Sequence, residues 1–220
     1  MSFHFWNISQ GVGPPLLLLH GFTGDTSSMS LVAEHLISTR TVVSVDLPGH
    51  GKTGDSGKQS DFEFDATLDA LIKTMEDNGF EKFDLLGYSM GGRLAIGLAI
   101  KYPSKINKIA VIGASAGISD DNQRLTRRKS DAYLADDISE KGIEWFVDYW
   151  MGQPMFTSQN RLEKEHLERL RVQRLGNDPK GLIKSLRGLG LASQPPLWKD
   201  LKYITSPTAI IVGEEDSKFR

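Results

Sequence analysis

The 220-residue sequence predicts an α/β fold in which helices flank a central, mostly parallel sheet. Two observations predict it. Short apolar runs alternate with segments of helical spacing through the first half of the chain, as in repeated strand-helix-strand units. The runs are also continuously apolar, which is typical of strands covered on both faces. A block without strand pattern then interrupts the alternation, and we expect a helical insertion there. The expected division is residues 1–118 for the first part of the core, 119–190 for the helical cap insertion and 191–220 for the second part of the core.

The expected strands are short. An alternating pattern near the N-terminus suits an edge strand, and the others are apolar runs bounded by turn residues. They are expected at residues 3–8, 16–19, 41–45, 83–86, 106–112 and 208–212.

The expected helices show apolar residues at spacings of three and four. Gly79 and Pro103 mark two of their ends, because glycine caps a helix C-terminus and proline cannot continue one. Helices are expected at residues 28–36, 66–78 and 91–102, and within the insertion at 138–150 and 162–175.

Composition excludes several classes of function. A net charge of −2 gives no reason to expect nucleic acid or an anionic membrane as partner. The sequence has no cysteine, so disulfides and thiolate metal sites are excluded, and a reducing compartment is favoured. The first residues lack the basic region and apolar stretch of a signal peptide. We therefore expect a cytoplasmic protein, and the sequence leaves its oligomeric state open.

The segment Gly87-Tyr-Ser-Met-Gly91 fits the pattern G-x-S-x-G between a predicted strand and a predicted helix. This context is typical of a nucleophile elbow, in which the serine sits on a strained turn and needs small neighbours. Ser89 is then the candidate nucleophile, and the main-chain N–H of Met90 is one donor of an oxyanion hole. The alternative is a glycine-rich turn with an idle serine.

The loop at residues 19–24 follows a buried strand, where this arrangement places the second oxyanion donor. We expect that donor to be the main-chain N–H of Phe22. His20 could be mistaken for a catalytic base, but its place at a strand end favours a structural hydrogen bond.

Residues 46–53 contain Gly-Lys-Thr and invite a phosphate-loop interpretation. That motif needs glycine at position 46, where Asp46 stands, and Pro48 removes an N–H group from the loop. A carboxylate would also repel phosphate. We therefore reject nucleotide binding.

Asp216 follows the last predicted strand, at the place of a triad acid. Glu214 or Glu215 could substitute, and a solvated acidic turn is the alternative. The chain order of such a triad is serine, acid, histidine, yet no histidine follows His166. We therefore expect the natural chain to continue beyond Arg220 with the histidine, a further strand and a final helix, without which the strand at 208–212 would be an exposed edge.

Together these segments resemble the α/β-hydrolase superfamily and, within it, the family of 2-succinyl-6-hydroxy-2,4-cyclohexadiene-1-carboxylate (SHCHC) synthases of menaquinone biosynthesis. The similarity extends along nearly the whole chain. It rests on Leu18-Leu-His-Gly-Phe-Thr-Gly24, Asp46-Leu-Pro-Gly-His-Gly51, Gly87-Tyr-Ser-Met-Gly-Gly-Arg93, Phe146-Val-Asp-Tyr-Trp150 and Gly213-Glu-Glu-Asp-Ser-Lys-Phe219. The first two segments occur widely in the superfamily, and the others are more particular to the synthases.

The resemblance implies a lyase on a hydrolase scaffold that needs no metal or organic cofactor. Its substrate would be a small polycarboxylate, 2-succinyl-5-enolpyruvyl-6-hydroxy-3-cyclohexene-1-carboxylate. Ser89, activated by a histidine that Asp216 orients, would remove a proton beside the succinyl carbonyl. The enolate would lie in the oxyanion hole, and pyruvate would leave.

The resemblance also implies the residues that bind the substrate, and arginines suit its three carboxylates because of their bidentate geometry. For Arg127, a solvated basic helix face is the alternative, and Arg171 is as plausible as Arg174. The implied residues are Tyr88, Arg93, Arg127, Trp150 and Arg174.

Two other functions stay open at this point. One is a serine esterase or C–C hydrolase of the same fold, in which Ser89 forms an acyl-enzyme. The other is a non-catalytic small-molecule binding protein, for which the missing histidine is the only support.

Overall fold

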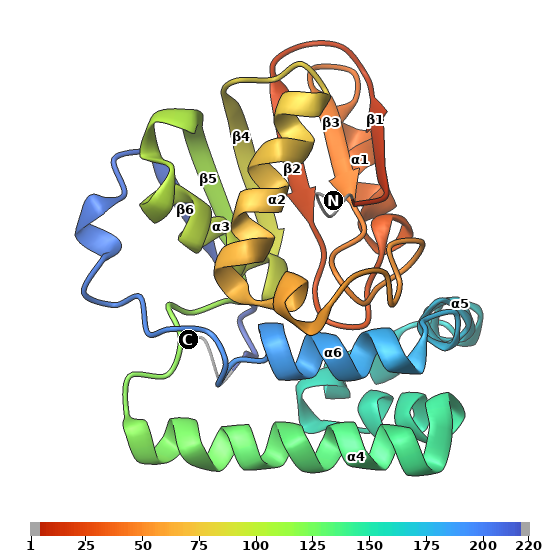
Figure 1. Cartoon of the computed structure of the whole chain (residues 1–220). Helices are drawn as coiled ribbons and strands as arrows, with labels where there is room; N and C mark the ends of the chain where they lie inside the picture. The colour runs from red at the N-terminus through yellow and green to blue at the C-terminus, as the bar shows by residue number, and fades with distance from the viewer. Residues whose placement is uncertain (1–4, 217–220) are drawn as a thin grey trace.

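The structure, a computed structural model, describes residues 5–216. Six strands form one sheet in the order β1-β3-β2-β4-β5-β6 (Figure 1). All neighbouring strands are parallel except β1, which pairs antiparallel with β3. This confirms the predicted mostly parallel sheet. The strands are β1 (Asn7–Gln10), β2 (Pro15–Leu19), β3 (Thr41–Val45), β4 (Phe83–Tyr88), β5 (Ile106–Ile112) and β6 (Thr208–Ile211).

Alternate residues of β2 face opposite sides of the sheet and enter different cores. Leu17 and Leu19 pack with α2 (Phe64–Asp77) and α3 (Met90–Lys101) on the face seen in Figure 1. Leu16 and Leu18 pack with the helix α1 (Ser30–Leu36) on the other face. Successive side chains of a strand point to opposite faces of the sheet, so a strand that is covered on both faces has an unbroken run of apolar residues.

The edge strands differ in part from their prediction. The strand predicted at residues 3–8 begins at Asn7 and ends at Gln10, and residues 3 and 4 lie outside the described part. The pairing sets this start, because Asn7 lies opposite Val45, the last residue of β3. Just before it, the Trp6 oxygen still accepts a hydrogen bond from the N–H of Asp46 at 2.9 Å. At the other edge of the described sheet, β6 pairs with β5 on one side, and Ile210 is 74% exposed.

Helices without any intervening strand connect β5 to β6, and they lie across the carboxyl ends of the parallel strands (Figure 1). We call residues 121–189 the helical segment. Its core joins α4 to α6 through Ala135, Ile138, Phe146, Val147, Leu182 and Leu186. The segment consists of α4 (Asp121–Met151), η4 (Pro154–Arg161), α5 (Lys164–Leu175) and α6 (Pro179–Leu189).

Two features of the helical segment differ from the predicted helices. The helix predicted at 138–150 is the second half of α4, which bends at Gly142 with a φ of 83°. The helix α6 was not predicted by itself, although Asp178 and Pro179 give a start signal: the Asp178 side chain accepts a hydrogen bond from the N–H of Lys180, and proline fits the first helical position. The boundaries proposed for the insertion, 119 and 190, stay a prediction.

Asp46 ties together the loops that follow β2 and β3. Its buried carboxylate accepts hydrogen bonds from the N–H groups of Thr26, at 2.6 Å, and Lys52, at 2.8 Å. Its main-chain oxygen accepts another from the hydroxyl of Thr53. Asp46 thus occupies N–H groups that a phosphate would need, consistent with the rejection of a phosphate loop.

Candidate active site

Ser89 lies on a sharp turn between β4 and α3 and has a φ of 51° and a ψ of −107°. A non-glycine residue rarely has positive φ, and here the surroundings hold it there. The N–H of Ser89 donates to the Ile112 oxygen at 2.8 Å, and the N–H of Gly91 donates to the His20 oxygen at 3.0 Å. This geometry is typical of a nucleophile elbow.

The glycines around Ser89 permit a close approach of main chains. A Cβ atom on Gly87 would lie 2.3 Å from the Gly91 oxygen, and one on Gly91 would lie 2.4 Å from the Leu19 oxygen. Both are far inside van der Waals contact with main-chain atoms that have little freedom to move. The small residues of the motif are therefore required by packing.

We expect Gly91→Ala to lower the free energy of unfolding by roughly 1–3 kcal/mol, because the new methyl group overpacks a rigid site. Chemical denaturation measures the change. Gly152→Ala is the matched control, since Gly152 has helical angles and a Cβ there would meet its nearest neighbour at 3.4 Å. The control should change stability by less than about 1 kcal/mol, and equal losses in both variants would contradict the packing explanation.

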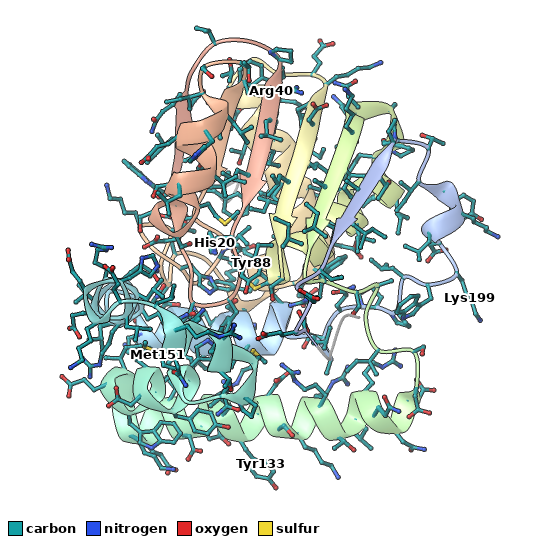
Figure 2. The ribbon with its side chains drawn as sticks, turned by 180° about the vertical axis from the view of Figure 1, so that it is seen from behind. His20, Arg40, Tyr88, Tyr133, Met151 and Lys199 are labelled. Carbon is teal, nitrogen blue, oxygen red and sulfur yellow. The ribbon has the colours of Figure 1, made fainter. Side chains whose placement is uncertain are left out.

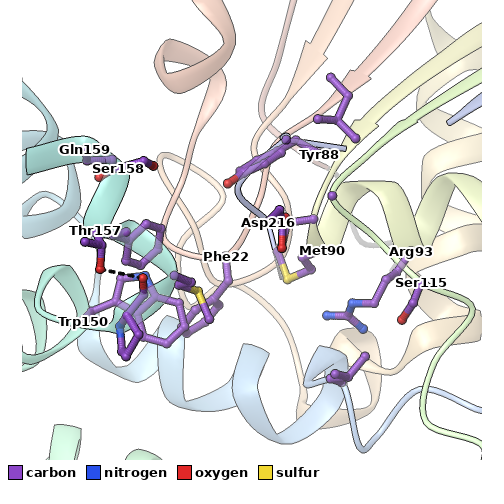
Figure 3. Close-up of a pocket in the computed structure, with 18 of the residues that line it drawn as sticks. Phe22, Tyr88, Met90, Arg93, Ser115, Trp150, Thr157, Ser158, Gln159 and Asp216 are labelled. Carbon is purple, nitrogen blue, oxygen red and sulfur yellow. Dashed lines mark hydrogen bonds between the residues drawn. The ribbon is translucent and has the colours of Figure 1, made fainter. Parts of the chain in front are cut away.

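A cavity of about 920 Å³ opens in front of Ser89, between the strand ends and the helical segment (Figure 3). All but one of the predicted site residues line it. Asp216 and Met90 lie near its centre in Figure 3, between Arg93 on one side and Trp150 on the other. The predicted residues at its wall are Phe22, Tyr88, Ser89, Met90, Arg93, Arg127, Trp150 and Asp216.

The two predicted oxyanion donors belong to elements that meet at Ser89. Met90 is the first residue of α3, and the first N–H groups of a helix have no partner within it. Phe22 follows Gly21, where an added Cβ would lie 3.4 Å from the Cβ of Ser89. Their assignment as donors stays a prediction.

Arg93 is a buried cation held by neutral partners. Its side chain donates to the Gln194 side-chain oxygen and to the Leu189 main-chain oxygen, each at 2.8 Å. Burial, followed by the nearby charge of Arg127, lowers the pKa of Arg93 to about 10, while Asp131 opposes the decrease. Arg93 therefore stays charged at neutral pH, and its charge is available to an anion in the cavity.

Arg127 lies on α4 and reaches the cavity from the helical segment. Its Nε donates to Asp131 Oδ1 at 2.7 Å, four residues further along the helix. A solvated basic face, the alternative considered from the sequence, does not describe Arg127, because it is only partly exposed and lines the cavity.

Arg174 is the predicted residue that does not appear in the cavity wall. It is buried next to it instead, with its guanidinium 5.1 Å from the ring centre of Phe156, which lines the cavity. Desolvation lowers the pKa of Arg174 and raises that of Tyr88, and the two groups interact electrostatically. Arg171, the alternative, pairs with Asp148 at 3.1 Å. Arg174 is thus the better candidate of the two.

Trp150 presents a polar atom as well as an apolar ring. Its ring lies 5.3 Å from that of Phe22 and 5.8 Å from that of Phe146. Within residues 5–216, its indole Nε1 is buried and has no hydrogen-bond partner. A bound ligand with an acceptor atom could satisfy it.

The three candidate acids, Glu214, Glu215 and Asp216, lie in the loop after β6 and all line the cavity. Asp216 lines the cavity together with Ser89, and its N–H donates to the Gly213 oxygen at 3.1 Å. Glu215 forms an ion pair with Arg161 of η4. Asp216 stays the predicted acid, and residues 217–220 of the same motif lie outside the described part.

His20 uses both ring nitrogens on the main chain. Nδ1 lies 2.8 Å from the Gly21 oxygen, and Nε2 accepts from the N–H of Leu47 at 2.9 Å. This confirms the predicted structural role of His20, at the strand ends that face the helical segment (Figure 2). His50 packs edge-on against it, with ring centres 5.1 Å apart. Burial, with a smaller contribution from His20, lowers the pKa of His50 to about 3, and burial also lowers the pKa of His20.

The buried His50 predicts a pH dependence of stability. The folded protein keeps His50 neutral down to about pH 3, whereas the unfolded chain takes up a proton below about pH 6.5. The stabilisation is therefore complete above pH 6.5 and is lost as the pH falls toward 3, by up to about 1.4 kcal/mol per pH unit. Urea unfolding between pH 4 and 7 measures this slope. His50→Gln should make it shallower, and an unchanged slope would contradict the assignment.

Sequence reasoning missed two polar residues that hold the arginines, Asp131 and Gln194. The Arg127/Asp131 spacing of four on a predicted helical stretch is a signal that could have found the first. Gln194 follows α6 by five residues and carried no motif. The wall formed by η4 was also missed, because its short 3-10 turns have no apolar period.

Within the described residues, no cluster of histidine and acidic side chains could hold a metal ion. The described helices also include none that is both long and apolar enough to cross a bilayer.

Comparison with known proteins agrees with this geometry. The family model of the alpha/beta hydrolase fold matches residues 14–220, which defines the class. The SHCHC synthase of Enterobacter sp. (strain 638) is 34% identical over 206 residues, which cover 94% of this chain and 77% of the relative. A protein of Bacillus subtilis (strain 168), provisionally given the same name, is 36% identical over 93% of this chain and 74% of its own length. The chain belongs to the SHCHC synthase family of α/β hydrolases.

Solved structures agree with this assignment. The structure of MenH from S. aureus has a TM-score of 0.90 and 34% identity, and the match covers 98% of this chain and 82% of that chain. A thermophilic esterase from Thermogutta terrifontis, solved with malate bound, has a TM-score of 0.81 and 25% identity, covering 96% of this chain and 75% of its own.

Proposed function

We propose that the protein is an SHCHC synthase, a lyase that eliminates pyruvate from 2-succinyl-5-enolpyruvyl-6-hydroxy-3-cyclohexene-1-carboxylate in menaquinone biosynthesis. The single observation that best supports it is the pairing of a serine elbow with arginines in one cavity: Ser89, Arg93 and Arg127 share the same wall. Guanidinium groups form charge-assisted, bidentate hydrogen bonds with carboxylates, so a polycarboxylate would gain more from these two arginines than a neutral ester would.

In the proposed reaction, Ser89 Oγ accepts the proton beside the succinyl carbonyl. The electron pair passes to the carbonyl oxygen, which the N–H groups of Phe22 and Met90 would stabilise as an enolate. As the enolate collapses, the carbonyl re-forms, double bonds form at C2=C3 and C4=C5 of the ring, and the bond from ring C5 to the enolpyruvyl oxygen breaks. The enolpyruvate that leaves then takes up a proton, equivalent to the one removed, and becomes pyruvate. Asp216 would orient a histidine that keeps Ser89 ready to accept the proton. His20 does not fit that part, because both its ring nitrogens bind the main chain.

The substrate would lie with its carboxylates toward Arg93 and Arg127 and its ring toward the aromatic wall. Arg174 and the Nε1 group of Trp150 are further donors for it, and Tyr88 adjoins the serine. The lack of cysteine supports a reducing compartment, and we propose that the reaction occurs in the cytoplasm.

Pyruvate release tests the proposal. The protein encoded by the complete open reading frame should release one pyruvate per substrate, measured in a coupled assay with lactate dehydrogenase. Ser89→Ala should lower kcat by roughly 10²–10⁴-fold, the usual range for a general base. Ser130→Ala, on an exposed turn of α4, is the control and should leave kcat unchanged.

Two outcomes would favour the other functions. Turnover of p-nitrophenyl esters without pyruvate release would make the protein an esterase or C–C hydrolase. The structural similarity to the Thermogutta esterase is the observation that supports this alternative. Tight binding of the substrate without any turnover would make it a binding protein.

A further inference from the structure

Asp131 is a buried carboxylate on α4, outside the wall of the main cavity. Its side chain is only 9% exposed. It lies instead at a second cavity of about 530 Å³, on the side of α4 that faces residues 186–188. A ligand of the main cavity would therefore contact residues of the wall and not Asp131 itself.

The wall residue that pairs with Asp131 is Arg127. Asp131 Oδ1 accepts from Arg127 Nε at 2.7 Å, and within residues 5–216 Oδ2 is buried and has no hydrogen-bond partner. A buried carboxylate is costly unless it is paired, so the ion pair with Arg127 is strongly favoured. In the same part of the chain, the two terminal amino groups of Arg127 donate no hydrogen bond to the protein.

The hydrogen bond from Nε restricts the orientation of the Arg127 guanidinium. A guanidinium binds carboxylates in its plane, either along the edge with Nε or across its two terminal nitrogens. With Nε on Asp131, the terminal nitrogens are left for a carboxylate in the cavity that Arg127 lines. A free arginine would instead lose side-chain entropy when it binds.

A glycine near Asp131 leaves room for the carboxylate of this residue. A Cβ on Gly190 would lie 2.9 Å from Asp131 Oδ2, so the glycine leaves room for it. The same chain segment supplies the Leu189 oxygen that holds Arg93. Arg93 and Arg127 interact unfavourably with each other, and the charge of Asp131 offsets this, as its opposing effect on the pKa of Arg93 indicates.

We propose that Asp131 is a positioning residue that holds Arg127, through Nε, so that its terminal amino groups bind one carboxylate of the substrate. The inference rests on the proposed function for the identity of that substrate. It assigns Asp131 no contact with the reacting atoms, so its loss should weaken binding more than it slows the chemical step.

A double-mutant cycle tests this coupling. Binding of the intact substrate is measured by calorimetry in a Ser89→Ala background, so that turnover does not interfere. Asp131→Asn keeps the volume and removes the charge, and we expect it to weaken binding roughly 5- to 30-fold. Arg127→Ala should weaken binding roughly 10- to 100-fold, the range of a charge-assisted hydrogen-bonded pair. The double variant should bind no more weakly than Arg127→Ala alone.

Asp137→Asn is the matched control, because Asp137 pairs with Lys141 at 2.6 Å on the same helix and at the same spacing, away from the cavity. It should change affinity less than twofold. Arg127→Lys is a second probe that keeps Asp131 paired. The three N–H donors of lysine share one nitrogen and lack the planar fork that lets a guanidinium reach acceptors on two sides, so this variant should bind nearly as weakly as Arg127→Ala.

Additive effects of Asp131→Asn and Arg127→Ala would overturn the inference, as would wild-type affinity in Arg127→Lys or no binding in the Ser89→Ala background. The pyruvate assay separates this from the proposed function. Pyruvate release with an additive cycle would reject only the positioning role. If the effects of the two substitutions are not additive, but the protein with Ser89 intact releases no pyruvate, the positioning role of Asp131 stands and the proposed synthase activity is rejected.

Discussion

The site depends on one close approach of main chains. The turn from β4 into α3 passes directly beneath the end of β2, where the N–H of Gly91 donates to the His20 oxygen at 3.0 Å. Only residues without a Cβ can come this near, and the same approach forces Ser89 to a φ of 51°. It brings the serine, the first N–H of α3 and the loop that carries Phe22 to one point. The other residues of the cavity wall surround this meeting place of Ser89, α3 and the Phe22 loop.

The second constraint is electrostatic. Buried cations are costly unless they are paired, yet Arg93 is held by a glutamine side chain and a main-chain oxygen. Of the acids near it, Asp131 is already paired with Arg127. The elbow helix and the helical segment therefore place two guanidinium groups in the cavity wall, while Glu214, Glu215 and Asp216 line the cavity from the loop after β6. Because guanidinium groups bind carboxylates with bidentate geometry, these two arginines make a polycarboxylate the best-supported ligand for this member of the SHCHC synthase family.

Much of the fold was predictable because its sequence patterns are local. The apolar runs at residues 41–45 and 106–112, and the elbow at Ser89, match their predictions closely. The features that were not predicted depend on residues that are distant in the sequence. The first strand starts at Asn7 because β3 ends opposite it, which no local pattern contains. The partners of Arg93, Gln194 and Leu189, are about one hundred residues away, and no motif announces them. The roles of the individual site residues stay predictions.

The most direct test of the account is a crystal structure of the Ser89→Ala protein, made from the complete open reading frame, with the intact substrate bound. The account predicts carboxylates within hydrogen-bond distance of the guanidinium groups of Arg93 and Arg127. It also predicts the succinyl carbonyl oxygen within about 3 Å of the N–H groups of Phe22 and Met90. A substrate whose carboxylates face solvent, or whose carbonyl lies away from these two N–H groups, would contradict it.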